Sequence, residues 1–151
     1  MKSLKSILFI VFALFAFTSC SEYSEFNEDA FESSSWTKTT GIEFNPVISS
    51  TGDYQAFIQL RYIDGLQFQQ IDAMAAVTSP AGTTDSIPFA FVLKNADGTS
   101  VADCAGDYCD LEMPFNYSFN EKGNYKVVVT YTMDMDGLGG VMGMGIDIRK
   151  K

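Results

Sequence analysis

YQAFIQLRY, at residues 54–62, alternates apolar and polar side chains with a single break. Successive side chains of a β-strand point to opposite faces, so this alternation is typical of a strand with one buried face. The face expected to be buried carries Tyr54, Ala56, Ile58, Leu60 and Tyr62. The opposite face carries Gln55, Gln59 and Arg61. The stretch therefore predicts a strand that packs on a core.

The same two-residue period recurs along the chain between turn signals such as NADG. It is found in GIEFNPVI (41–48), DSIPFAFVL (85–93), LEMPFNYSF (111–119), NYKVVVTYTM (124–133) and VMGMGIDI (141–148). FQQIDAMAAV (68–77) fits either a strand or a short helical turn, and Pro46 favours an edge position. About seven short strands, spaced by roughly ten residues, predict an all-β fold, an antiparallel β-sandwich.

The N-terminal segment has the features of an export signal. Two lysines, Lys2 and Lys5, precede eleven apolar residues from Ile7 to Phe17, and small residues follow. A membrane-spanning helix needs about 20 apolar residues, so this run is too short to be one. We expect residues 1–19 to be a signal peptide that is removed.

Three cysteines are an odd number, which in an exported protein requires an explanation. Phe17-Thr18-Ser19-Cys20 resembles a bacterial lipobox, in which the cysteine receives diacylglycerol, becomes the mature N-terminus and is acylated again. We therefore predict lipid attachment at Cys20. The alternative is an ordinary signal peptide that leaves a free thiol at Cys20.

The other two cysteines lie in CAGDYC, a loop expected between two strands. Two cysteines in a chain without histidine do not make a zinc site, and redox pairs have the closer C-x-x-C spacing. A structural disulfide between Cys104 and Cys109 is the better interpretation for an exported protein.

Residues 20–35 are rich in Ser, Glu, Asp and Asn, which favours a flexible acidic tether after the lipidated cysteine. Tyr23, Phe26 and Phe31 are unusual in such a linker, so part of it is expected to dock on the domain. The β-sandwich is then expected to span residues 36–151.

Composition excludes several functional classes. Removing residues 1–19 takes away two lysines and no acid, which leaves 8 Lys and Arg against 19 Asp and Glu, a net charge of −11. Nucleic acid is therefore not an expected partner, and an acidic surface also repels anionic lipid head groups. With no histidine and no convergent catalytic set, we expect no enzyme activity, no metal and no cofactor.

Two motifs suggest metals but have simpler interpretations. Asp134, Asp136 and Gly137 resemble the start of a calcium loop, but Gly145 stands where that loop needs a glutamate, so a hairpin turn is favoured. The methionines at 133, 135, 142 and 144 alternate along two strands expected to pair, which favours core packing over copper binding.

The order of the strands and turns resembles the gliding-motility lipoproteins of the GldH type. The carriers are WTKTTGIEF, YQAFIQLRY with Arg61, SPAGTTDSIPFAFVL, PFNYSF, KGNYKVVVTYTM and DGLGGVMGMGIDI. The chain departs from that family at CAGDYC, which replaces a Trp/Gly-rich segment, at Met135, where a basic residue is common, and around Ile71-Asp72.

The resemblance implies a non-enzymatic lipoprotein of the cell envelope, expected at the outer membrane and compatible with either face of it. Its expected partners are membrane lipid through Cys20 and envelope proteins of the gliding and secretion machinery. The alternative is a surface glycan-binding module serving a nutrient importer, with Trp36, Tyr108 or Tyr117 stacking on sugar rings.

Overall fold

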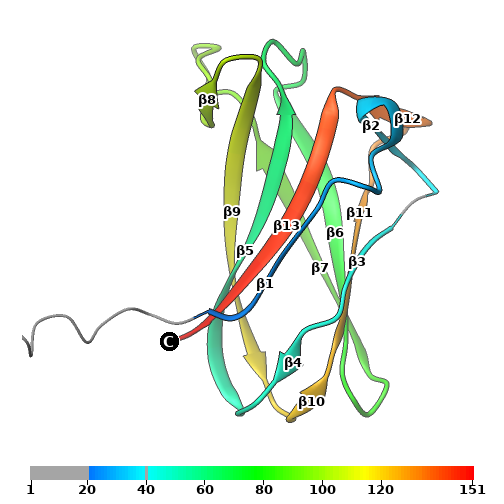
Figure 1. Ribbon diagram of the computed structural model, residues 1–151, viewed down its shortest axis with the longest axis vertical. Helices are drawn as coiled ribbons and strands as arrows, with labels where there is room; N and C mark the ends of the chain where they lie inside the picture. The colour runs from blue at the N-terminus through cyan, green and yellow to red at the C-terminus, as the bar shows by residue number, and fades with distance from the viewer. Residues whose placement is uncertain (1–20, 40) are drawn as a thin grey trace, which may run out of the picture.

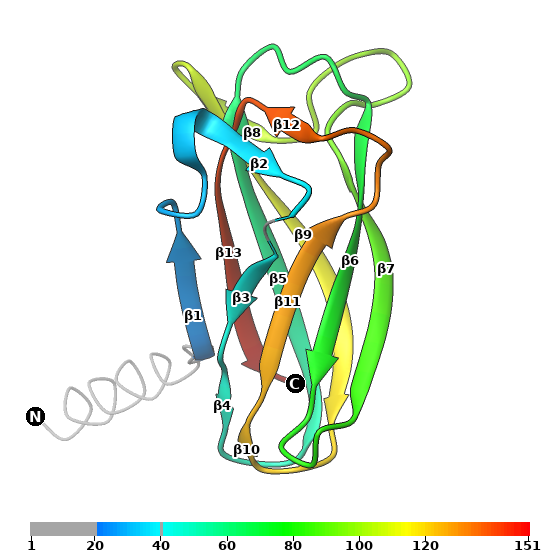
Figure 2. The same cartoon turned by 90° about the vertical axis from the view of Figure 1, so that its right-hand side faces the viewer.

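The computed structural model describes residues 21–39 and 41–151. Within these ranges the protein is all-β: two antiparallel sheets face each other, with a single 3-10 turn at Glu32–Ser34 (Figures 1 and 2). The predicted antiparallel β-sandwich is therefore confirmed. A search of the described residues finds no helix with the length and apolar character needed to cross a membrane.

The first sheet has five strands in the order β1-β13-β5-β9-β8. Their bounds are β1 Ser21–Asn27, β13 Val141–Lys150, β5 Gly52–Ile63, β9 Tyr108–Phe119 and β8 Asp103–Ala105. All of its neighbouring pairs are antiparallel. The quoted stretch YQAFIQLRY lies in β5, at the centre of this sheet.

The second sheet has four strands in the order β3-β11-β6-β7. Their bounds are β3 Ile42–Phe44, β11 Lys126–Tyr131, β6 Gln70–Thr78 and β7 Thr84–Val92. Two short ladders close the ends of the sandwich: β4 Val47–Ile48 with β10 Gly123–Asn124, and β2 Ser35–Thr37 with β12 Gly137–Gly139.

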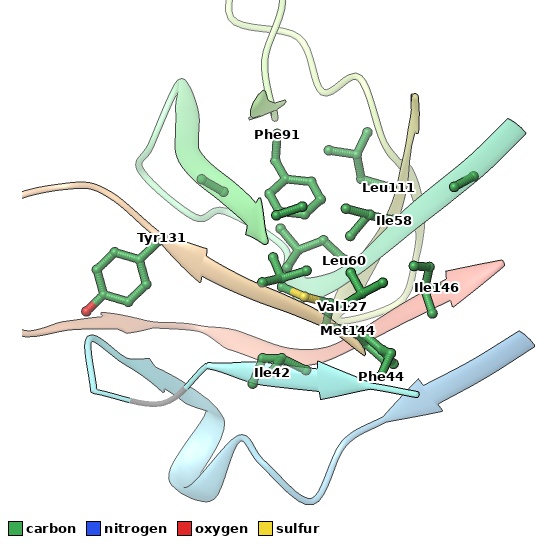
Figure 3. Close-up of a cluster of buried hydrophobic side chains, with 14 of the residues drawn as sticks. Ile42, Phe44, Ile58, Leu60, Phe91, Leu111, Val127, Tyr131, Met144 and Ile146 are labelled. Carbon is green, nitrogen blue, oxygen red and sulfur yellow. The ribbon is translucent and has the colours of Figure 1, made fainter. Parts of the chain in front are cut away.

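The core lies between the inward faces of the two sheets, as the alternation predicts. Tyr54, Ala56, Ile58, Leu60 and Tyr62 of β5 are all buried. Figure 3 shows Ile58 and Leu60 from β5 facing Val127 from β11 and Phe91, with Met144 and Ile146 from β13 beside them.

The ambiguous stretch FQQIDAMAAV contains strand β6, not a helical turn. It is paired with β11 on one side and β7 on the other, so its backbone groups are satisfied within the ladder. Ile71, Ala73, Ala75 and Val77 are buried. The small side chains of Ala73, Ala75 and Val77 fit between the two sheets. Tertiary pairing overrides the weak strand propensity of alanine here.

On the side of the sandwich between β7 and β9, two strand edges are left largely unpaired by the described residues. β7 is the edge of its sheet, and β8 pairs only with Tyr108–Asp110, so most of β9 is also an edge. Each edge carries a proline, Pro88 in β7 and Pro114 in β9. Proline removes a hydrogen-bond donor from an edge and so discourages pairing with another chain.

The methionine interpretation needs one correction. Met133 follows strand β11, and Met144 lies in strand β13. These two strands do not pair, because β11 pairs with β3 and β6, whereas β13 pairs with β1 and β5. Met144 is fully buried in the core, and Met133 and Met135 pack partly against it. Met144 therefore lies in the core, and Met133 and Met135 pack against it from the segment after β11.

Replacing Ile58 with alanine should lower the free energy of unfolding by about 3 kcal/mol, because a fully buried side chain is lost from the central strand. Chemical denaturation measures this change. Gln55→Ala, on the outward face of the same strand, is the matched control and should stay within about 0.5 kcal/mol of wild type. Equal losses in the two variants would contradict the assigned faces.

Candidate functional site

The N-terminal residues extend the first sheet. Residues 21–27, expected to be a flexible tether, form strand β1 along β13, with Glu25 opposite Ile146 and Phe26 opposite Gly145 (Figure 1). The physical reason is that β13 would otherwise have an unpaired edge, and Tyr23 and Phe26 supply the side chains that hold β1 there. Further on, Phe31 and Trp36 are buried in the core.

Two glycines in β13 make room for Phe26. A Cβ atom on Gly143 would lie 2.6 Å from Phe26 Cε1, and one on Gly145 would lie 2.5 Å from Phe26 Cδ2. Both distances are closer than non-bonded carbon atoms approach. The GMG sequence of residues 143–145 thus leaves a shallow groove on the outward face of the sheet, and the Phe26 ring fills it.

Arg61 lies over the other side of the Phe26 ring. Its Cζ atom is 5.2 Å from the ring centroid of Phe26 and 4.9 Å from that of Tyr108. An arginine above an aromatic face is attracted by the electrons of the ring. The three side chains come from β5, β1 and β9, and we call them the Arg61 patch.

Two carboxylates fix the guanidinium of Arg61. Arg61 Nε donates to Asp110 Oδ1 at 2.8 Å and Nη2 donates to Asp110 Oδ2 at 3.0 Å, while Nη1 donates to Glu28 Oε1 at 3.0 Å. The hydrogen bond with Asp110 is the main reason that the pKa of Arg61 is raised. Paired, planar contacts of this kind orient arginine closely, although exposed ion pairs contribute only about 0–1 kcal/mol each.

The Arg61 patch is partly open to solvent. Phe26 and Tyr108 are each 40% exposed, and the Arg61 side chain is 30% exposed. A hollow of about 230 Å³ beside them is lined by Phe26, Gln59, Arg61, Asp110, Leu111 and Glu112. Aromatic residues and arginine are enriched where proteins bind each other, so this surface suits a protein partner.

Strand β1 also contacts the segment that follows β3, on either side of β4, through side chains. Glu22 Oε1 accepts a hydrogen bond from the backbone N of Ser49 at 2.6 Å, and Tyr23 Oη accepts one from the backbone N of Asn45 at 3.2 Å. The Ser49 hydrogen bonds lower the pKa of Glu22, and burial, with a hydrogen bond to Glu25, raises the pKa of Tyr23 to about 12. β1 is therefore held at Asn45 and Ser49, on either side of β4, as well as along β13.

The predicted cysteines fall in different parts of the chain. Cys20 lies outside the described residues, directly before Ser21 in the sequence. Cys104 and Cys109 form a disulfide between paired positions of β8 and β9. This bridge closes a hairpin next to Tyr108 and does not link the two sheets.

The metal motifs do not form a binding site in the described part of the chain. The one grouping of possible ligand atoms there contains Asp64 with Cys104 and Cys109, all within 4.8 Å of one another. The two sulfurs are bonded to each other, so neither is the thiolate that a metal needs. In the suspected calcium loop, Asp134 instead forms an exposed ion pair with Lys38 at 3.5 Å.

The aromatic residues of the glycan alternative are not arranged as a platform. Trp36 is 0% exposed and packs edge-on against Tyr131, so its assignment to sugar stacking is wrong. Tyr117 is half-buried and donates a hydrogen bond to Asp85 Oδ2 at 2.8 Å, and burial is the main reason that its pKa is raised. Only Tyr108 is exposed, and Arg61 already lies over its ring.

Sequence reasoning placed Arg61 on the outward face of its strand but missed its partners. The signal for Phe26 in the sequence is that an aromatic residue is unusual in a linker. Glu28 and Asp110 carry no sequence signal, because they are 33 and 49 residues away from Arg61 along the chain.

Comparison with known proteins identifies the family of this chain. The family model described as GldH lipoprotein matches residues 23–148, from strand β1 to strand β13. The chain belongs to the GldH lipoprotein family, and the resemblance found in the sequence is confirmed. A similar protein is the gliding motility lipoprotein GldH of Flavobacterium johnsoniae, which is 26% identical over 126 residues, covering 78% of this chain and 79% of that one.

Solved structures give weaker likenesses. A family 35 carbohydrate binding module from Clostridium thermocellum has a TM-score of 0.41 and 16% identity, covering 82% of this chain and 90% of that chain. A non-crystalline cellulose specific carbohydrate-binding module has a TM-score of 0.45 and 11% identity, covering 77% and 72%. Similarity at this level assigns no ligand to the chain.

Gly145→Ala should loosen strand β1, because the new Cβ would meet the Phe26 ring and the backbone O of Glu25 at 2.9 Å. We expect faster amide hydrogen exchange throughout β1, with slow exchange retained in β5. Gly139→Ala is the matched control, since its Cβ would meet nothing within 4 Å. Unchanged exchange of β1 in Gly145→Ala would contradict the described fit.

Proposed function

We propose that this protein is a lipid-anchored, non-enzymatic interaction protein of a bacterial gliding-motility apparatus and its associated protein secretion. The observation that carries the proposal is the GldH lipoprotein match, which runs through the whole sandwich from residue 23 to residue 148. The Flavobacterium johnsoniae relative, a gliding motility lipoprotein, supports the link to gliding motility.

The lipid attachment site in this proposal is Cys20. The support is the lipobox-like sequence before it, together with the pairing of Cys104 and Cys109, the other two cysteines of the sequence. Acyl chains contribute about 0.8 kcal/mol per buried CH₂, and two or more chains give stable attachment. We place the protein in the cell envelope, at the outer membrane.

The contact surface for envelope proteins in this proposal is the Arg61 patch. It combines two half-exposed aromatic rings with an arginine that is already held in one orientation, which lowers the entropy lost on binding. A glycan-binding role is the weaker alternative, because its expected tryptophan is buried.

Cys20→Ala should release the protein from membranes, because the site of acylation is removed. Cell fractionation with immunoblotting measures the distribution, and mass spectrometry of the wild-type N-terminal peptide shows the lipid directly. Cys104→Ala combined with Cys109→Ala is the matched control and should remain in the membrane fraction. A Cys20→Ala protein as membrane-bound as wild type would exclude lipid anchoring.

Tyr108→Ala should weaken partner capture while the fold is kept, because the ring lies at the surface above Arg61. Crosslinking in intact cells, followed by affinity purification, measures the envelope proteins recovered, and colony spreading reports motility. Val92→Ala is the control, since Val92 is 46% exposed on the edge strand β7, outside the patch. Equal recovery of partners from both variants would exclude the Arg61 patch as the contact surface.

A further inference from the structure

The start of strand β1 fixes the distance between the anchor and the folded domain. Ser21 is the residue after Cys20 and already pairs with Arg149 of β13. Consecutive Cα atoms of a trans peptide are 3.8 Å apart, so a lipid on Cys20 is joined to the sheet without an intervening linker. Glu22 and Tyr23 tie the same strand to the backbone of Ser49 and Asn45.

The residues around this point form what we call the anchor corner: Glu22, Ser49, Arg149, Lys150 and Lys151. Lys150 Nζ donates to Ser50 Oγ at 2.8 Å, and the backbone N of Lys151 donates to the backbone O of Asp53 at 3.1 Å. In Figure 1 the strand β13 that carries Arg149 ends beside the beginning of β1. Three consecutive basic residues thus lie next to the attachment point of the anchor.

Three acids near this corner, Glu22, Asp53 and Asp147, formally balance its three basic residues, so the corner is close to neutral and the far end of the sandwich is the acidic one. Glu22 accepts a hydrogen bond from the Ser49 backbone N at 2.6 Å, and Asp53 Oδ1 accepts one from Ser118 Oγ at 2.5 Å. Asp147 is buried and accepts hydrogen bonds from Arg149, whose guanidinium also lies 4.7 Å from the ring centroid of Phe57. The ammonium groups of Lys150 and Lys151 are left at the outer surface.

The opposite end of the sandwich is acidic. Figure 2 places β8 and β12 at that end, away from β4, β10 and the end of the chain. The loops and strands there carry exposed acids: Asp64, Asp97, Asp103, Asp107, Asp134 and Asp136. An anionic membrane surface attracts basic segments and repels acidic ones over about a Debye length, roughly 8–10 Å.

We propose that the anchor corner rests on the phosphate head groups of the membrane, with the acidic loop end pointing away from it. This orientation rests on the proposed lipidation of Cys20. It differs from the expectation, drawn from net charge alone, that the whole surface repels anionic lipid.

The orientation also positions the Arg61 patch. Phe26 is five residues beyond Ser21 in an extended strand, so the patch is held roughly 17 Å along β1 from the anchor. A partner in the envelope can reach it there without displacing lipid. The membrane surface and the partner surface then lie at opposite ends of strand β1.

The test uses the mature lipidated protein, reconstituted in vesicles of phosphatidylethanolamine and phosphatidylglycerol that contain a head-group nitroxide lipid as a quencher. One fluorophore is attached to Ser49→Cys at the anchor corner, and in a second protein to Ala96→Cys in the exposed turn at the loop end. Both variants keep the Cys104–Cys109 disulfide, so each offers one free thiol. We expect quenching to be several-fold stronger at position 49 than at position 96.

A second arm inserts ten Gly and Ser residues between Cys20 and Ser21, a linker with an average span of about 17 Å. The contrast between the two positions should then fall several-fold, because the anchor no longer fixes the domain. Equal quenching at both positions without the linker would overturn the orientation, whereas a contrast unchanged by the linker would overturn only the role of the short anchor in fixing it. A protein that fails to float with vesicles would instead overturn the lipid anchor itself, which separates the two failures.

Discussion

The constraint on which the rest depends is the pleat of strand β5, which is hydrogen-bonded to β13 on one side and β9 on the other. Because its side chains alternate between two faces, one strand builds both the core and the functional surface. Ile58 and Leu60 point into the sandwich, while Gln59 and Arg61 point out. A shift of register by one residue would exchange these roles and bury a guanidinium.

The neighbouring strands β13 and β9 determine which groups surround the outward face of β5. On one side, β13 contributes Gly143 and Gly145, which carry no side chains and let Phe26 lie close to the sheet. On the other side, β9 contributes Asp110, directly opposite Arg61 in the ladder. Strand pairing thus gives Arg61 an aromatic ring on either side and a bidentate carboxylate. We assign this surface to a protein partner.

With the lipid attachment that we propose at Cys20, strand β1 would link this surface to the membrane. In a family of lipoproteins, a flexible tether after the modified cysteine would leave the domain free to rotate. Here the chain is paired from Ser21 onwards, and Phe26 in the same strand completes the Arg61 patch. In the proposed arrangement, anchoring and partner contact are mechanically coupled, because a force applied at the patch would be transmitted to the lipid through the seven residues of β1.

The sequence by itself determined the strand faces, the sandwich class and the pairing of Cys104 with Cys109, because alternation and cysteine spacing are local patterns. It also indicated the GldH family and pointed to Cys20. It did not determine that residues 21–27 form a strand, since Ser and Glu are poor strand formers and only the free edge of β13 makes that conformation favourable. Nor did it show Phe26, Arg61 and Tyr108 together or Trp36 buried. Those features depend on residues tens of positions apart meeting across the sheets, and only the tertiary structure decides such contacts.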